Sequence, residues 1–548
     1  MPMLLALVAL PQQAEYAVTV APPSERRVDV VAQLRQLPPG ELVVRMPRQY
    51  AFVALPGPRF SRVPQARAGG REIEIDRTDP YEWRLIKGDA REVELSYGIA
   101  LTHRDVPEVA ERDAYEHPYI EADHGMLTTG AVFALLDDPK QLRVRFSLPD
   151  AWPVFAPWHA TAPGEFEPAN RHALEDSIVA FGAWKSRTVE VGGARVETLF
   201  APSELEFEPL AAPLIEDIAR AELELFGVRP FEHFLFLFTP SNTRGFAGSA
   251  KQGALVLSVM HGLPASAAAP NIAHLCAHEF FHTWASSRYD APDELRFLNE
   301  GFTDYFAHLV VAQTGAGGWE EFAESLARRV LTYEEAARST RASLVGAGGE
   351  PFFTSREAYD QIYSGGLALA AWMDLALRAR EPRTDLAAWL REFNNDARWE
   401  RGGRTPTLDD FLALVEKRLG PAAATRTRSL VTSTEPVDFV RAWSELGCKV
   451  ERTSAPAKAE LRANLEGARI VDLDPQSLGA RLGLRAGDEL LEVNGVRAID
   501  AATIHRAFAT PLEGRVRLRW RRGAQELGVD EPLPVETKLR LDSAPWRS

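Results

Sequence analysis

The sequence predicts a multidomain α+β protein built from three units. Its 548 residues exceed one domain, since globular domains average about 150 residues. Short alternating apolar runs such as VDVVAQL and EVELSYGIAL, separated by Pro and Gly, indicate β structure from Tyr16 to Glu197. Apolar residues then recur at helical spacing from Pro213, and short strands return after residue 446. We therefore expect an N-terminal β-sandwich-like domain at 15–200, an α+β unit ending in helices at 201–445, and a small module at 446–540.

Residues 1–14 form a candidate signal segment. Met3–Leu10 is an apolar run of signal-peptide length, although no Lys or Arg precedes it and Pro11–Ala14 is a poor cleavage site. No run approaches the roughly 18 apolar residues that span a bilayer, so we expect no transmembrane anchor. We expect a periplasmic or secreted protein, with a cytoplasmic location as the alternative.

Composition narrows the functional classes. Hydrophobic residues at 45% and charged residues at 25% are typical of a globular chain rather than a disordered one. The net charge of −15 disfavours nucleic acid as a partner, because nucleic-acid binders are more often basic. Two cysteines, Cys276 and Cys448, are too few for a disulfide framework or a Cys-rich zinc ribbon.

The stretch His278-Glu279-Phe280-Phe281-His282 matches H-E-x-x-H within a predicted helix at 270–286. Positions i and i+4 lie on one helix face, so both imidazoles can bind one ion with Glu279 beside it as general base. Zinc suits two neutral His nitrogens and a carboxylate, with water in the fourth position. Taken alone, the pattern also fits a helix with two satisfied surface histidines.

A third ligand is available in Phe297–Phe306, which reads FLNEGFTDYF. Glu300 begins a predicted helix at 298–314, which can bring it back to the His pair. Asp304 is one turn further on the same face, where it can accept the other ring N–H of a ligand His and orient that ring. Taken alone, Glu300 is an acid favoured at a helix start by the dipole, and Asp304 is a surface acid.

These motifs resemble those of the gluzincin metallopeptidases. HEFFHTW, together with the terminal module, resembles the glycyl aminopeptidase family among them. The resemblance implies a thermolysin-like catalytic domain with a helical extension, one zinc ion per chain, and a peptide or unfolded protein segment as substrate. It implies an aminopeptidase that prefers small N-terminal residues. It also implies a tyrosine that polarises the scissile carbonyl, a role that falls on Tyr363 in Ile362–Leu367, with Tyr359 as the runner-up.

The substrate region departs from the family. Its Gly-rich strand entry carries a Glu that anchors the free amine of the substrate, whereas Gly245–Gly253 places Gly248 at that position and holds no acid. An endopeptidase on the same site therefore stays open as an alternative. We place Gly245, Gly248 and Ala254 in the substrate-binding region and expect the strand Ala254–Val259 to pair with an extended peptide by β-addition.

The terminal module resembles a bacterial PDZ domain. Gly483–Gly495 reads GLRAGDELLEVNG, with turns at Gly487-Asp488 and Asn494-Gly495. The resemblance implies a PDZ-like domain with a peptide ligand, although Ala459-Glu460-Leu461 replaces the usual Leu-Gly before the binding strand. Two alternatives stay open: a PDZ-bearing binding protein with an idle metal site, and hydrolysis of a non-peptide amide or epoxide. No G-x-S-x-G, P-loop or dinucleotide motif occurs.

Overall fold

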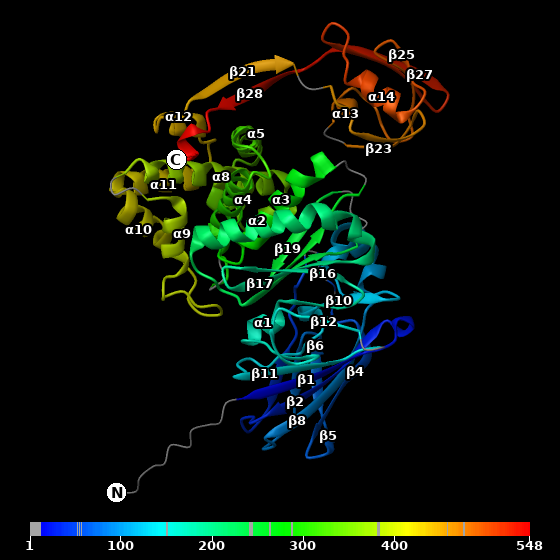
Figure 1. Ribbon diagram of the computed structural model, residues 1–548, viewed down its shortest axis with the longest axis vertical. Helices are drawn as coiled ribbons and strands as arrows, with labels where there is room; N and C mark the ends of the chain where they lie inside the picture. Colours follow the sequence, from blue (N-terminus) through cyan, green and yellow to red (C-terminus); the bar gives the residue numbers. More distant parts are fainter. Residues whose placement is uncertain are drawn as a thin grey trace.

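The computed structural model describes residues 12–547 except 52, 54, 56, 150–151, 241–244, 262–264, 286–288, 381–383, 457–458 and 475–476. Three units follow one another along the long axis (Figure 1). The β-rich N-terminal domain lies at one end, the helical unit in the middle and the PDZ-like domain at the other end. This mixed helix and sheet architecture confirms the predicted fold class.

The N-terminal domain is built from three sheets. The largest has the order β13-β14-β11-β1-β2-β8-β4-β5, with two smaller sheets ordered β3-β7-β6 and β12-β15-β10-β9. The strands of the largest sheet are β1 (Gln13–Val20), β2 (Arg27–Arg35), β4 (Phe60–Ala68), β5 (Arg71–Ile73), β8 (Glu92–Ala100), β11 (Gln141–Ser147), β13 (His159–Ala162) and β14 (Glu165–Glu167). The others are β3 (Leu42–Arg45), β6 (Ile75–Asp79), β7 (Glu82–Leu85), β9 (Tyr119–Ile120), β10 (His124–Thr128), β12 (Val154–Phe155) and β15 (Ile178–Gly182), with a short helix α1 (Arg171–Glu175).

The apolar alternation in the sequence sets these strands. Strand β2 buries Val28, Val30, Ala32 and Leu34, while the residues between them are partly exposed. This period of two is that of a sheet with one face against a core. Residues 1–11 of the candidate signal segment 1–14 lie outside the described residues, and Gln13 is the first residue of β1.

The central unit contains a five-stranded sheet with the order β16-β17-β18-β20-β19. Its strands are β16 (Lys185–Val191), β17 (Ala194–Phe200), β18 (His233–Phe238), β19 (Ala247–Lys251) and β20 (Ala254–Ser258). The sequence of β18, HFLFLF, is apolar at nearly every position because both sheet faces are covered. Phe234, Phe236 and Phe238 pack against helices, whereas Leu235 and Leu237 pack against the β12-β15-β10-β9 sheet of the N-terminal domain. That second contact brings the N-terminal domain close to the strands that line the active-site cleft.

The hairpin β16–β17 favours an earlier domain boundary than the one expected from the sequence. The alternating pattern favoured an N-terminal β domain that extends to residue 200, but β17 pairs with β18 in parallel, so residues 185–200 are part of the five-stranded sheet of the central unit. Alternation alone cannot assign a strand to one of two adjacent sheets. We therefore propose that the N-terminal domain ends near residue 183.

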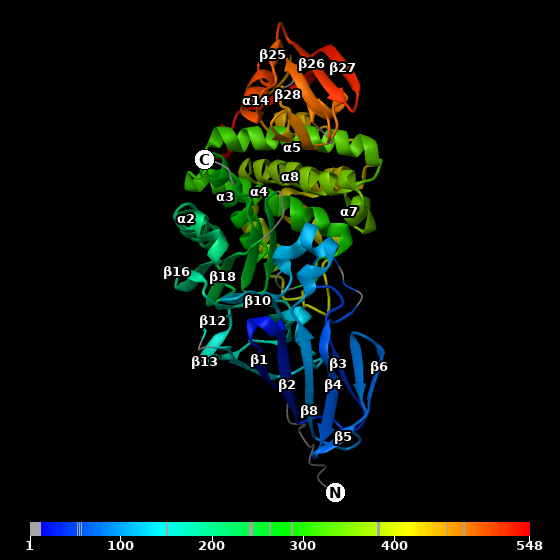
Figure 2. The same cartoon turned by 90° about the vertical axis from the view of Figure 1, so that its right-hand side faces the viewer.

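Helices complete the central unit. They are α2 (Glu208–Phe226), α3 (Ala265–Phe281), α4 (Thr303–Thr314), α5 (Trp319–Thr340), α6 (Leu344–Ala347), α7 (Glu350–Thr354), α8 (Arg356–Arg378), α9 (Leu386–Asn394), α10 (Leu408–Leu419), α11 (Pro421–Thr432) and α12 (Phe439–Ser444). Helices α5 and α8 run side by side below the PDZ-like domain (Figure 2). Helix α11 was not predicted because its sequence, PAAATRTRSLVT, has no apolar repeat at helical spacing and buries only Thr427 and Val431.

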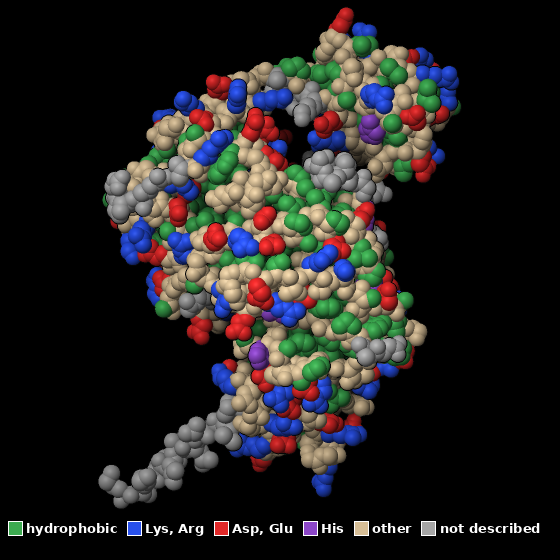
Figure 3. All heavy atoms as spheres, viewed as in Figure 1, with side chains coloured by type: hydrophobic (Ala, Val, Ile, Leu, Met, Phe, Trp, Pro, Cys, Tyr) green, Lys and Arg blue, Asp and Glu red, His purple; other side chains and the backbone are tan. Residues whose placement is uncertain are grey.

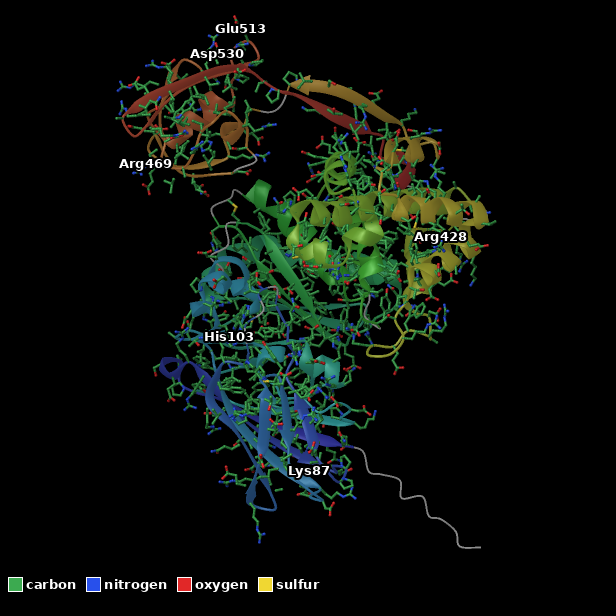
Figure 4. All side chains as sticks on the ribbon, turned by 180° about the vertical axis from the view of Figure 1, so that it is seen from behind. Lys87, His103, Arg428, Arg469, Glu513 and Asp530 are labelled. Carbon is green, nitrogen blue, oxygen red and sulfur yellow. The ribbon has the colours of Figure 1, made fainter. Side chains whose placement is uncertain are left out.

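The PDZ-like domain is carried on a two-stranded arm. Strands β21 (Val450–Pro456) and β28 (Val535–Leu541) pair with each other, and the chain then returns to the helices, where Trp546 contacts Phe322 and Trp443. Between them lie β22 (Ala463–Glu466), β23 (Arg469–Leu473), α13 (Leu478–Arg481), β24 (Glu489–Val493), β25 (Val496–Arg497), α14 (Ala501–Phe508), β26 (Arg515–Arg522) and β27 (Gln525–Pro532). Glu513 and Asp530 lie at the far end of this domain, and Arg469 lies on the side that faces the helices (Figure 4).

Within the described part of the chain, none of the helices combines the length and the apolarity that crossing a membrane requires.

Candidate metal centre and active-site cleft

Helix α3 presents the two histidines of the H-E-x-x-H motif at its C-terminal end. It ends at Phe281 rather than continuing to the predicted residue 286, and His282 lies in the tight turn that follows. Two hydrogen bonds to other elements stabilise that turn. The Asn394 side-chain amide donates to the Trp284 carbonyl at 2.8 Å, and Trp284 Nε1 donates to the Val228 carbonyl at 2.8 Å. The rings of His278 and His282 lie 5.1 Å apart, centroid to centroid.

Glu300 approaches both histidines from a π-helical turn, η9 (Phe297–Phe302), that leads into α4. Its Oε2 atom lies 3.7 Å from His278 Nε2 and 3.8 Å from His282 Nε2. Single π-helical turns inside helices occur often at functional sites.

A glycine contact sets how closely η9 and α8 pack. A Cβ atom on Gly301 would lie 2.4 Å from the Cα of Gly366, and a Cβ on Gly366 would lie 2.3 Å from the Phe297 carbonyl oxygen. Only glycine at both positions permits this backbone approach. The contact holds Glu300 and Tyr363, one on each element, beside the same histidines.

The donor set fits zinc. In a zinc tetrahedron with bonds of about 2.0 Å, ligand atoms lie roughly 3.4 Å apart, so the distances of 3.7 and 3.8 Å need only a small inward adjustment. Burial alone raises the pKa of Glu300, but the nearby imidazoles of His278 and His282 outweigh burial and lower the pKa to about 2. Glu300 is therefore a carboxylate at neutral pH, as a metal ligand must be.

Glu279 projects from the same helix end toward the edge strand β19. Burial raises its pKa to about 7, and the nearby charge on His278 opposes that rise. A Cβ atom on Gly248 of β19 would lie 2.6 Å from Glu279 Cγ. Gly248 therefore leaves room for the Glu279 side chain, which explains why no acid is found at that position.

The close approach of Gly248 to Glu279 predicts what a methyl group added at position 248 would do. We expect Gly248→Ala to push the Glu279 carboxylate from its position and to lower kcat on the order of 10²-fold, with zinc content unchanged. Steady-state kinetics and metal analysis measure the two quantities. Gly245→Ala is the matched control, since a Cβ at Gly245 meets no atom within 4 Å. Equal activity of the two variants would show that Glu279 tolerates the displacement.

Helix α8 places Tyr363 against the metal-binding histidines. Its ring stacks on that of His278 with centroids 5.7 Å apart, and Tyr359 lies one turn away with ring centroids 4.5 Å apart. Burial, and then the negative charge of Glu300, raise the pKa of Tyr363 well above its usual value. The phenol therefore keeps its proton at neutral pH and can donate a hydrogen bond.

Asp304 on α4 lies behind His278. Its Oδ1 atom is 3.7 Å from His278 Nδ1, longer than a hydrogen bond, and 3.0 Å from His274 Nε2. Its Oδ2 atom pairs with the Arg329 guanidinium at 2.7 Å. The structure brings Asp304 to the ligand histidine and also reveals two neighbours, His274 and Arg329, that the motif did not predict.

The cleft beside these residues has a volume of about 780 Å³. Its wall includes β19 and side chains from several elements, among them Tyr115, Phe246, Phe352, Tyr359, Arg296 and Arg401. Strand β19 is the edge of the five-stranded sheet, so one of its sides has no strand partner among the described residues, although its Gly248 carbonyl accepts a hydrogen bond from the Tyr115 hydroxyl.

Two of the predicted substrate residues lie elsewhere. Ala254 is fully buried on β20, which pairs with β18 on one side and β19 on the other, so the prediction that 254–259 accepts a peptide is wrong. The antiparallel strand β19 covers the edge that the sequence left open. Gly245 precedes β19 and does not line the cleft, while its neighbour Phe246 does.

The N-terminal domain contributes an acid that sequence reasoning missed. Glu116, in the short helical turn η4 (Ala114–Glu116), is buried, and its Oε2 atom lies 3.4 Å from the Lys251 ammonium of β19. Lys251 also lies 3.7 Å from Asp176. The adjacent Tyr115 hydroxyl donates to the Gly248 carbonyl at 3.3 Å. No sequence signal marks Glu116, because it lies more than 130 residues from β19 in a different domain.

Each of the three units contains a stretch that matches a known domain family. Residues 15–183 match the peptidase M61 N-terminal domain, 271–366 the M61 glycyl aminopeptidase domain, and 469–522 a PDZ domain. An aminopeptidase N family protein from Idiomarina loihiensis has the same fold, with a TM-score of 0.70, 15% identity, and coverage of 98% of this chain and 99% of that one. An M1 zinc metallopeptidase from Deinococcus radiodurans gives a TM-score of 0.51 and 16% identity over 78% of this chain and 96% of its own. No curated protein sequence gives a significant match.

The fold and the matched domains define a zinc metallopeptidase. More closely, the chain carries the N-terminal and catalytic domains of the M61 glycyl aminopeptidase family, followed by a PDZ domain, which confirms the family resemblance.

Proposed function

We propose that His278, His282 and Glu300 hold one catalytic zinc ion and that this zinc peptidase acts as an aminopeptidase on peptides or unfolded protein segments. The observation that carries the site is the convergence of these three ligands on one point, with Glu279 beside them. Zinc at such a site supplies Lewis acidity, which polarises the scissile carbonyl and lowers the pKa of water.

The residues of the chain perform the remaining steps. Glu279 accepts the proton of the attacking water and then delivers it to the leaving amine, a task suited to its pKa of about 7. The Tyr363 hydroxyl donates a hydrogen bond to the oxyanion that forms on the substrate carbonyl. Asp304 orients the His278 ring from behind. The open side of β19 holds the substrate in an extended conformation by β-addition.

The proposed role of Tyr363 predicts a loss of turnover. We expect Tyr363→Phe to lower kcat on the order of 10²-fold without changing zinc content, because only the hydroxyl that stabilises the oxyanion is removed. Kinetics on a short peptide and metal analysis test this. If Tyr359→Phe causes the loss while Tyr363→Phe is silent, the role is that of Tyr359.

Glu116 supports cleavage at free N-termini. A buried substrate ammonium is costly without a carboxylate partner, and the Gly-rich strand entry supplies none. Glu116 lies close enough for its negative charge to contribute to the raised pKa of Glu279, and its Oε1 atom is buried without a hydrogen-bond partner among the described residues. The proposed enzyme prefers small residues at the N-terminus of its substrate, because the matched family is described as a glycyl aminopeptidase.

An endopeptidase is the second candidate, and Lys251 favours it. Its ammonium neutralises part of the Glu116 charge that an aminopeptidase would direct to the substrate. A neighbouring cavity of about 1140 Å³ shares Ser249, Lys251 and Gln252 with the cleft and leaves room for a longer chain.

One experiment distinguishes the two. Peptides with free and with acetylated N-termini are incubated with the enzyme, and mass spectrometry identifies the products. An aminopeptidase removes single residues from free peptides only, and Glu116→Gln weakens that cleavage while the exposed Glu224→Gln on α2 does not. Internal cuts in acetylated peptides that survive Glu116→Gln indicate an endopeptidase. No product that depends on Glu279 would refute the proposed mechanism.

We also propose export, on the basis of Met3–Leu10, and a peptide ligand for the PDZ domain. N-terminal sequencing of the protein isolated from culture medium or periplasm tests the first proposal. The second is tested by peptide binding to the full chain, with the cleft closed by a zinc-directed inhibitor.

A further inference from the structure

A second group of metal-binding side chains lies behind the catalytic ligands. His274 is one turn before His278 on α3, and His308 is one turn after Asp304 on α4. Donor atoms of His274, Asp304 and His308 lie within 4.8 Å of one another, and the two imidazole centroids are 4.2 Å apart. We propose that these three residues form a second zinc site, separate from the catalytic one.

The donors are available for an ion. The Nε2 atom of His274 is buried and lies 3.0 Å from Asp304 Oδ1, yet it makes no well-formed hydrogen bond in the described part of the chain. A nitrogen and a carboxylate oxygen placed together in this way offer two ligands to one cation. His308 supplies the third from the neighbouring turn, which gives the two-imidazole and one-carboxylate set that suits zinc.

The charge on Asp304 is divided between its two oxygens. Arg329 of α5 pairs with Oδ2 at 2.7 Å, so Oδ1 is the atom that faces the two imidazoles. A carboxylate has lone pairs on each oxygen and can serve the guanidinium and an ion at once. Arg329 therefore orients the carboxylate without occupying the proposed ligand atom.

The site borders two cavities, because His274 and Asp304 also line the catalytic cleft. His274 and His308 line a cavity of about 1800 Å³ between the catalytic helices and the PDZ domain, which contributes Arg462 and Arg481 to the wall. The surface is hollowed between these two parts and the β21–β28 arm (Figure 3). Water from this cavity can complete the coordination. Tetrahedral ligand atoms lie roughly 3.4 Å apart, so small rotations of the imidazoles complete the geometry.

Occupancy of the second site affects the first. Asp304 Oδ1 is also the oxygen nearest His278 Nδ1, at 3.7 Å. An ion on that oxygen withdraws negative charge from the ring that is proposed to bind the catalytic zinc. Zinc at the second site is therefore expected to weaken the catalytic site and reduce turnover about tenfold.

Zinc counting tests the site without reference to activity. The full chain is dialysed to equilibrium against micromolar free zinc, and bound metal is measured by mass spectrometry. We expect two ions on the natural chain, one on His308→Ala, one on His282→Ala and none on the double variant. His274→Gln provides a second route to one ion. His505→Ala, exposed on α14, should keep two.

Two results overturn the proposal. The natural chain could saturate at one zinc ion, or His308→Ala and His274→Gln could both still bind two while unfolding at the same temperature as the natural chain. Turnover at excess zinc then tests the coupling: inhibition should disappear in His308→Ala, and inhibition that persists there would contradict it. Zinc counting needs no substrate. If the proposed peptidase mechanism failed, the number of zinc ions bound per chain would still test the second site.

Discussion

Replacing Glu279 with Gln is expected to lower kcat on the order of 10³-fold while the catalytic zinc ion stays bound. The amide has nearly the same shape as the carboxylate, so it fits the space beside Gly248. It cannot accept the proton of the attacking water. The loss should therefore appear in kcat, with little change in KM for short peptides, because the substrate contacts on β19 are untouched.

Kinetics with a chromogenic peptide and metal analysis of the same sample measure both quantities. Glu224→Gln is the matched control, since it makes the same chemical change at an exposed position on α2. Turnover within a few-fold of the natural enzyme would remove Glu279 from the mechanism. A parallel loss of zinc would instead indicate that the substitution disturbs the end of α3.

Replacing His282 with Ala is expected to abolish both catalytic zinc binding and peptidase activity. His282 is one of the three proposed protein ligands, and two remaining ligands do not hold zinc in a tetrahedral site against a chelator. The natural chain should also gain thermal stability from zinc at this site, because an ion that binds only the folded state stabilises it. That gain should be lost in the variant.

Metal content after brief dialysis with a weak chelator, and unfolding temperature with and without zinc, test this prediction. His159→Ala, exposed on β13 of the N-terminal domain, is the control for loss of a histidine. If His282→Ala retains the chelator-resistant zinc ion, the ligand assignment is wrong. If it unfolds at lower temperature than the natural chain does in the absence of zinc, the turn after α3 has a structural role of its own.

Local spacing was enough to single out the candidate metal ligands that the structure brings together. His278 and His282 are one helical turn apart, and Glu300 begins an element that must pack beside them if the three are to meet. The alternating run of β2 and the nearly all-apolar run of β18 likewise predicted strands. These features depend on the period of one element, so neighbouring residues carry the whole signal.

Contacts between different helices and strands could not be predicted from local spacing. The strand Ala254–Val259 looked like an open edge because nothing in its sequence shows that β19 folds back onto it. Gly248 looked like a missing acid, whereas its function is to leave room for Glu279. The domain boundary could not be fixed from the sequence, because an alternating hairpin has the same sequence pattern in either of two neighbouring sheets.

The sequence by itself determined the class of this protein, a zinc metallopeptidase with a PDZ domain, and it singled out candidate metal ligands and a candidate general base. Only the tertiary structure decided what surrounds these residues, including Lys251 at the cleft, Glu116 beside Lys251, and the group formed by His274, Asp304 and His308. The physical reason is the separation, along the sequence, of the residues that come into contact. Ligand spacing within a helix is set by the backbone over four residues, whereas these neighbours are brought together by the packing of helices, sheets and domains far apart in the chain.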